Sequence, residues 1–343
     1  MAARALALLA PLAGLARAQD GPSLEDFTRE LRAKTSSFFP TGRSALRGFG
    51  GFGQLEPTPL QGPRPPTFDV KILRKLEHPH APWTQGLEFA SDGRLIETCG
   101  DFPAGVGSFV RVLDPDTGKV RRSTSDGLID EEGKNRFIEG IVESGKRWYA
   151  TTYEDKLAIE YDKDFKVVSK HPYPYNGWGL ANSPDGRSFL VTNGTEYVMS
   201  LAAGTWKYES TKVAHCMGKR LRGLNELEMV EDFAGTGPKL LANLVNTRLV
   251  FAMDPETMEC AGVFHLEDTE PIAANERGGY HVANGIAYNK KSGTFFVTGK
   301  NWESMYEIAV SKAPPRVVSH AGDLLESHLA LAGEYKPLAH SGM

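Results

Sequence analysis

Five short segments recur along the chain. Each begins with one distinctive residue, which is usually followed by a glycine and then by a large apolar residue. Successive segments are 39 to 59 residues apart, and they open at Gln85, Glu139, Trp178, Asn225 and Asn284. A repeat of this length corresponds to one four-stranded blade of a β-propeller. Short β-rich runs and turn signals separate the segments, and no long amphipathic helical pattern occurs between residues 67 and 317. The repeat therefore predicts an all-β, five-bladed β-propeller.

The last repeat contains only three strand-like runs, at residues 285–288, 294–298 and 305–310. An unpaired strand-like run at residues 69–76 precedes the first repeat. A ring without exposed sheet edges results if this run becomes the outer strand of the last blade. We therefore expect a propeller closed by an N-terminal strand supplied to the last blade. A non-closed sandwich or a second small domain is the alternative architecture.

The regions outside the repeats indicate targeting and connecting segments. Residues 1–18 are typical of a signal peptide, because Arg4 precedes an apolar run and an A-x-A pattern would leave Gln19 near the new N-terminus. A transit peptide, or a terminus that is merely unusually apolar, is the alternative. Residues 19–66 are rich in Gly and Pro, as in a linker or pro-segment. Residues 67–317 hold the propeller, and residues 318–343 form a C-terminal tail. We expect a protein of the secretory pathway or the extracellular space.

Composition excludes several classes of function. The 39 Lys and Arg residues against 43 Asp and Glu residues give a net charge of −4, which does not suit binding to nucleic-acid phosphates. No run after residue 18 approaches the length of a transmembrane helix. We expect a monomer with no nucleic-acid partner and no membrane span.

The cysteines and one sequon leave questions open. Cys99, Cys216 and Cys260 allow one disulfide and one free thiol, or no disulfide at all. They contain no C-x-x-C pair, so we expect no thiolate zinc site. Asn193 begins an N-glycosylation sequon, a triplet that also occurs by chance.

The repeat also predicts where a functional site lies. The first strand of each propeller blade lines the central channel, so the five opening residues should converge at one mouth. The turn after each second strand faces the same mouth and contributes Tyr153 and Lys300. A carboxylate and an ammonium would then border a pocket walled by Trp83, Trp178 and Tyr153, which is typical of a small-ligand site. Each residue alone has a plainer explanation, since a Trp is usually core and a loop Lys is usually solvated.

Motifs around the opening residues, taken in order, resemble the plant- and bacterial-type glutaminyl cyclases, or glutamine cyclotransferases. They lie at residues 83–88, 138–141, 177–180, 224–228 and 284–288, with 297–302 after the last. The resemblance covers roughly residues 68–310 and implies a five-bladed propeller. It implies an enzyme that converts the N-terminal glutamine of peptides or proteins to pyroglutamate with release of ammonia, without a catalytic metal or a cofactor. The family's active-site positions carry onto Trp83, Gln85, Glu139, Trp178, Asn225 and Lys300, whereas Tyr153 and Val245 stand where the family has Trp.

Each of these residues can be given a chemical task. Glu139 is the opening residue that can carry protons between the attacking amine and the departing nitrogen. Aromatic walls should raise the pKa of Glu139, and Lys300 should oppose that shift. Lys300, with Asn225 or Gln85, can donate hydrogen bonds to an oxyanion. We expect Glu139, Lys300 and Asn225 to be catalytic, and the substrate-binding residues to be Trp83, Gln85, Trp178, Tyr153 and Asn284.

Two other functions remain open at this point. A metal-dependent propeller hydrolase of the lactonase kind would bind Ca²⁺ or Zn²⁺ through Glu139, Asn225 and Asn284. Against it, only one of the five opening residues is charged, and Lys300 would repel a cation. A non-catalytic peptide-binding propeller is the second alternative, because fold does not determine function. Such a protein would not need the carboxylate and the ammonium together.

Overall fold

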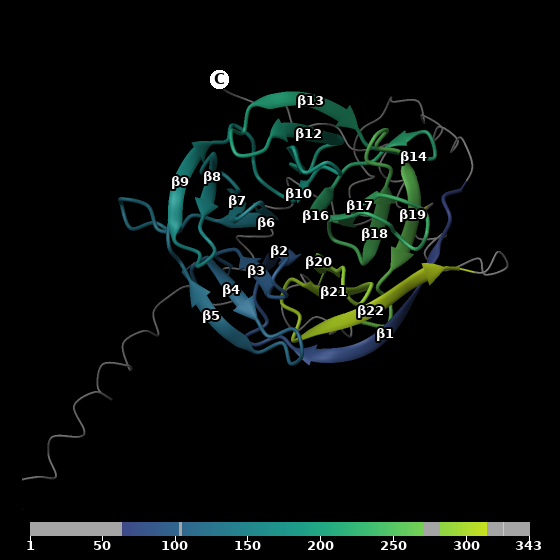
Figure 1. Ribbon diagram of the computed structural model, residues 1–343, viewed down its shortest axis with the longest axis horizontal. Helices are drawn as coiled ribbons and strands as arrows, with labels where there is room; N and C mark the ends of the chain where they lie inside the picture. The colour runs from purple at the N-terminus through teal and green to yellow at the C-terminus, as the bar shows by residue number, and fades with distance from the viewer. Residues whose placement is uncertain (1–63, 103–104, 270–281, 314–324, 326–343) are drawn as a thin grey trace, which may run out of the picture. The chain divides into compact units, whose positions relative to one another are not determined.

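The computed structural model describes residues 64–102, 105–269, 282–313 and Leu325, all within the compact unit Pro57–Met343. The described part contains five four-stranded antiparallel sheets and one two-stranded sheet (Figure 1). The all-β architecture predicted from the repeats is therefore confirmed. In the part of the chain that the structure describes, no helix is long and apolar enough to cross a membrane.

The first four blades each consist of four strands that are consecutive in sequence, with the innermost strand first. Blade one contains β2 (Thr84–Phe89), β3 (Leu95–Cys99), β4 (Phe109–Leu113) and β5 (Val120–Thr124). Blade two contains β6 (Ile138–Ser144), β7 (Arg147–Thr152), β8 (Leu157–Tyr161) and β9 (Val167–Pro172). Blade three contains β10 (Leu180–Asn182), β11 (Ser188–Val191), β12 (Tyr197–Ala202) and β13 (Tyr208–Val213). Blade four contains β16 (Leu224–Val230), β17 (Lys239–Leu244), β18 (Leu249–Met253) and β19 (Cys260–His265).

The fifth blade closes the ring with strands from both ends of the repeat region. It contains β20 (Ala283–Asn289), β21 (Thr294–Gly299), β22 (Ser304–Lys312) and, outermost, β1 (Phe68–Glu77). Strand β1 pairs antiparallel with β22 from Phe68 opposite Lys312 to Glu77 opposite Ser304. This pairing agrees with the closure expected from the sequence. The five inner strands are neighbours in the cyclic order β2, β6, β10, β16 and β20, which completes a five-bladed β-propeller (Figure 1).

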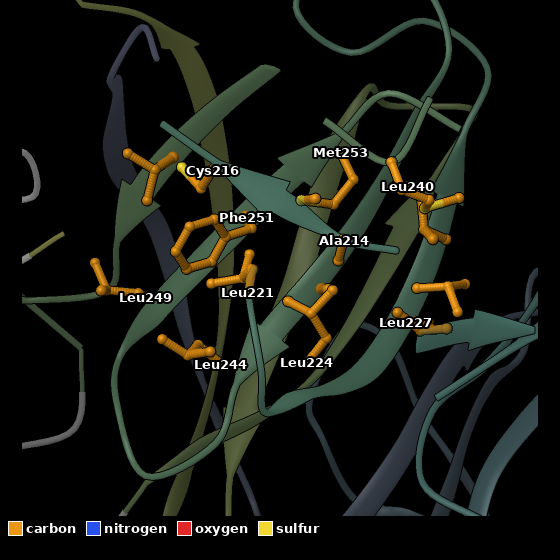
Figure 2. Close-up of a cluster of buried hydrophobic side chains, with 14 of the residues drawn as sticks. Ala214, Cys216, Leu221, Leu224, Leu227, Leu240, Leu244, Leu249, Phe251 and Met253 are labelled. Carbon is orange, nitrogen blue, oxygen red and sulfur yellow. The ribbon is translucent and has the colours of Figure 1, made fainter. Parts of the chain in front are cut away.

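The hydrophobic core lies between the blades. Inner strands such as β2 and β16 are buried over most of their length, whereas the outer strand β5 is largely exposed. In blade four, Phe251 belongs to a buried cluster that includes Leu224 of β16 and Leu244 of β17 (Figure 2). Each fully buried side chain of this size stabilises the fold by about 1.5–3 kcal/mol. Packing on both faces holds the inner strands rigidly around the axis.

A small hairpin between blades three and four was not expected from the sequence. It pairs β14 (His215–Cys216) with β15 (Lys219–Arg220). The carboxylate of Glu196 anchors the segment, because its oxygens lie 3.1 Å from Arg220 Nη1 and 2.9 Å from Arg222 Nε. All three cysteines are free thiols, and a bridge between His215 and Glu259 places Cys216 beside Cys260.

The signal peptide, most of the predicted linker and the C-terminal tail lie outside the described residues. The exception in the tail is Leu325, which is buried in the core cluster of blade four.

Candidate active site

The residues that open the inner strands lie together at one end of the ring. Gln85, Glu139, Asn225 and Asn284 are each less than 5% exposed, and Trp178 comes just before β10. Gly140 N donates a hydrogen bond to Trp178 O at 2.8 Å, and Asn284 Nδ2 donates to Gln85 Oε1 at 3.3 Å. These contacts join neighbouring blades, so the opening residues converge as the repeat predicts.

Glycine follows four of the five opening residues. The backbones of neighbouring blades touch at Gly86, Gly140 and Gly179, whereas Gly285 has a positive φ of 102°. A Cβ at Gly140 would lie 2.6 Å from Leu180 N, and one at Gly179 would lie 2.0 Å from Asn225 O. Real Cβ atoms do not approach backbone so closely, so only glycine permits this packing. The glycine in these motifs therefore allows neighbouring blades to pack closely next to the site.

Glu139 and Lys300 form the charged centre of the site. Lys300 follows β21 in sequence, and its backbone N donates to Val282 O at 2.9 Å. Burial raises the pKa of Glu139 to about 8, and the positive charge of Lys300 opposes the shift. Burial lowers the pKa of Lys300 to about 8, and the charge of Glu139 opposes that shift. Near neutral pH, Glu139 is therefore mostly a neutral acid and Lys300 mostly a cation, and both change state around pH 8.

Aromatic side chains surround this centre. Lys300 Nζ lies 5.1 Å from the ring centroid of Trp83, a cation–π distance. The ring of Trp83 lies 3.9 Å, centroid to centroid, from that of Phe102. Burial raises the pKa of Tyr153, and the charges of Glu154 and Glu139 add to the shift. The ring of Trp178 packs on the turn at Gly194, where an added Cβ would lie 2.5 Å from it.

The amide side chains at the site differ in what they contact. Asn284 Nδ2 also donates to Thr84 O at 2.9 Å, so this side chain ties blade five to blade one. Since Gln85 Oε1 accepts from Asn284, the N–H groups of Gln85 remain for a ligand. Asn225 Oδ1 and Asn284 Oδ1 are both buried without a hydrogen-bond partner among the described residues. All three amides can therefore offer polar groups to a substrate, and Nδ2 of Asn284 also holds Gln85 in place.

Sequence reasoning missed several residues of this region. Phe102 and Phe137 join the aromatic walls from loops, and Tyr173 follows the outermost strand of blade two. Burial raises the pKa of Tyr173, and Tyr175 and Glu139 add to the shift. Three carboxyls with raised pKa values on the inner strands β2 and β16 were also overlooked: Glu88, Glu226 and Glu228. The three acids stand within the repeated motifs, so their positions on inner strands could have been predicted. No sequence signal places Phe102, Phe137 and Tyr173 at the site.

The carboxyls deeper in the ring have pKa values shifted in the same direction. Burial raises the pKa of Glu88 to about 8, and the charge of Glu143 adds to the shift. Burial raises the pKa of Glu228, which shares a hydrogen bond with Glu88. No group of three or more His, Cys, Asp or Glu residues arranged to hold a metal ion occurs among the described residues.

The fold and this site define a five-bladed β-propeller protein that gathers a buried carboxyl, an ammonium and aromatic rings at the start of its inner strands. The sequence profile of the glutamine cyclotransferase family matches residues 52–310, and the chain belongs to that family. A glutaminyl-peptide cyclotransferase of Arabidopsis thaliana is 28% identical over 250 residues, covering 71% of this chain and 72% of the relative. The fold resembles the crystal structure of Myxococcus xanthus glutaminyl cyclase, with a TM-score of 0.62 at 23% identity over 73% of this chain and 100% of that one.

Proposed function

We propose that the protein is a glutaminyl-peptide cyclotransferase, which cyclises the N-terminal glutamine of peptides or proteins to pyroglutamate and releases ammonia. Membership of the glutamine cyclotransferase family supports the reaction class. The observation that carries the mechanism is the buried pair of Glu139 and Lys300, each with a pKa of about 8. Such a pair supplies a proton donor and a cation at the pH where a peptide α-amine, with a pKa of about 7.7–8.0, becomes nucleophilic.

The reaction forms a bond between the α-nitrogen and the side-chain amide carbon, and it breaks the bond to the amide nitrogen. Attack by the neutral amine creates a tetrahedral oxyanion, to which Lys300 and the amide of Gln85 donate hydrogen bonds. Protonated Glu139 gives its proton to the departing nitrogen, which leaves as ammonia. The carboxylate then takes the excess proton from the new ring nitrogen, so Glu139 ends the cycle as it began.

The remaining residues hold the substrate in the reactive conformation. Trp83, Trp178 and Tyr153 enclose the glutamine side chain and keep it folded toward the α-amine. Asn225 Oδ1 accepts a hydrogen bond from the substrate amine or amide. Asn284 donates to Gln85 through Nδ2, and its unpartnered Oδ1 can accept a hydrogen bond from the substrate.

The proposal is tested by incubating the purified protein with a peptide that begins with glutamine. Ammonia release and a blocked N-terminus are the expected results. The same peptide with an acetylated α-amine has no free nucleophile and should release no ammonia. Absence of turnover with the free peptide, with and without added Ca²⁺ or Zn²⁺, would favour the non-catalytic peptide-binding propeller. Turnover that a chelator abolishes would favour the metal-dependent alternative.

The rate should have a bell-shaped dependence on pH with its maximum near pH 8. Below that pH the substrate amine gains a proton and ceases to be a nucleophile, since its pKa is about 7.7–8.0. Above it, Glu139 loses the proton that the leaving nitrogen needs, and Lys300 loses its charge, because both have a pKa of about 8. Measuring kcat/KM from pH 6 to pH 10 checks this. A rate that stays constant far above pH 8 would contradict the proposed protonation states.

We propose that the protein enters the secretory pathway, which the signal-peptide pattern in residues 1–18 supports. Cleavage after Ala18 would leave Gln19 as the N-terminus, and this residue is itself a substrate for the proposed activity. The secreted protein should therefore carry pyroglutamate at position 19, formed when one copy acts on another.

Mass spectrometry of the N-terminal peptide tests this prediction, because cyclisation lowers its mass by one ammonia. The Glu139→Gln variant, secreted and purified in the same way, serves as the control for spontaneous cyclisation. An unblocked Gln19 in active secreted protein would contradict the prediction. An N-terminus at Met1 would contradict secretion itself.

A further inference from the structure

The fourth blade departs from the pattern that marks the other blades. Gly86, Gly140, Gly179 and Gly285 follow their opening residues, but Glu226 follows Asn225. Glu226 is only 1% exposed, so its carboxyl is enclosed within the ring. Burying a carboxyl is unfavourable unless its oxygens are hydrogen-bonded.

The carboxyl of Glu226 contacts the backbone of two other blades. Leu87 N, in blade one, donates to Oε1 at 3.2 Å, and Ile286 N, in blade five, donates to Oε2 at 2.9 Å. The partners are 139 and 60 residues away in the sequence. One side chain therefore links the inner strands of blades one, four and five.

The corresponding positions in blades one, two and three join the next blade by direct backbone packing. A Cβ at Gly86 would lie 2.9 Å from Ile141 N in blade two, and the contacts of Gly140 and Gly179 reach blades three and four. Between blades four and five, the Glu226 carboxyl takes over this role by hydrogen bonding. Asn243 assists, since Gly285 N donates to Asn243 Oδ1 at 3.0 Å.

The linked backbones carry three of the five opening residues. Leu87 is two residues after Gln85, Ile286 is two residues after Asn284, and Glu226 is adjacent to Asn225. Displacing any of these backbones would move an amide that faces the substrate. A misplacement of about 1 Å in a catalytic arrangement can lower the rate by about 10²-fold.

We propose that Glu226 is a positioning residue for the cyclisation reaction, holding Gln85, Asn225 and Asn284 in register by joining the strands that carry them. This inference rests on the proposed function. Glu226 itself does not touch the reacting atoms in this scheme, because both of its oxygens face backbone N–H groups.

The test compares Glu226→Gln with Glu307→Gln. A Gln side chain keeps the size of Glu, but it offers one acceptor oxygen and turns an NH₂ group toward the other backbone N–H. The kcat of Glu226→Gln should fall by about 10- to 100-fold, with a much smaller change in KM, at a temperature where circular dichroism shows the protein folded. Glu307→Gln removes a buried carboxyl from strand β22, outside the inner strands, and should keep nearly the parent kcat. The pH profile of Glu226→Gln should retain the parent's alkaline limb, since Glu139 and Lys300 remain.

The inference is overturned if Glu226→Gln keeps a kcat within about twofold of the parent, or if Glu307→Gln loses as much. A purely structural role would lower the melting temperature and leave the activity of the folded molecules unchanged. If Glu226→Gln does not fold, Glu226→Asp tests the same geometry, because it keeps the carboxyl group but withdraws both oxygens by one methylene. A parent-like kcat in folded Glu226→Asp would also overturn the inference, whereas an inactive parent would refute the proposed function instead.

Discussion

Glu139→Gln should abolish measurable turnover, lowering kcat by about 10²–10⁴-fold, while binding of a glutamine-initiated peptide persists. The side chain of Gln has the size of Glu, so the packing around residue 139 is preserved. It cannot give a proton to the departing nitrogen or take one from the new ring, so the leaving group must depart as an amide ion. Ammonia release at pH 8 measures the loss, and isothermal titration with the same peptide measures the binding.

Glu143→Gln is the matched control for this variant. Glu143 lies on the same strand, β6, but its carboxylate accepts a hydrogen bond from Ser91 N at an exposed position. Its replacement should leave kcat unchanged. Near-normal turnover in Glu139→Gln would remove Glu139 from the proton-transfer role.

The same variant should change how stability depends on pH. Glu139 has a pKa of about 8 in the folded protein, against an ordinary value near 4.5. Between these values the unfolded chain ionises and the folded protein does not, so the free energy of unfolding contributed by this group falls as pH rises. Glu139→Gln lacks this term. Its melting temperature should exceed that of the parent at pH 8 and approach it at pH 4. This result would show that Glu139 destabilises the folded protein at the pH where the enzyme works.

The ring and the positions of the opening residues were predictable because both depend on local sequence. Glycine before a large apolar residue marks a close approach between blades, and the missing strand of the last repeat indicates how the ring closes. The contacts of Gly140 and Gly179 show the physical basis of this signal. The expected direction of the pKa shift of Glu139, raised by burial and opposed by Lys300, followed from placing both residues at one mouth.

The contacts between the opening residues were not predictable, because they join segments far apart in sequence. The hydrogen bond from Asn284 to Gln85 spans 199 residues, and it gives Asn284 a supporting role for Gln85 beside the substrate contact predicted from the sequence. Alternating acids such as Glu226 and Glu228 usually indicate the solvated face of a strand. Inner strands of a propeller are buried on both faces, so the same pattern here places the acids inside the ring.

Replacement of Lys300 by Met should lower kcat by about 10²–10³-fold and change KM much less. Met keeps most of the aliphatic length beside Trp83 but cannot donate to the oxyanion, an interaction made only as the carbonyl is attacked. Removing the cation also removes the charge that opposes the burial effect on Glu139, so the pKa of Glu139 should rise further. The alkaline limb of the residual activity should therefore move to higher pH, which a kcat/KM profile of the variant would detect.

Lys290→Met provides the control, because Lys290 is exposed and pairs with Glu231 at the surface. That variant should keep the parent's kcat and pH profile. A rise in KM at unchanged kcat in Lys300→Met would make Lys300 a binding residue, since the lost interaction would then be equal in the ground state and the transition state. A fall in kcat together with the alkaline shift supports Lys300 as the oxyanion donor that also sets the protonation state of Glu139.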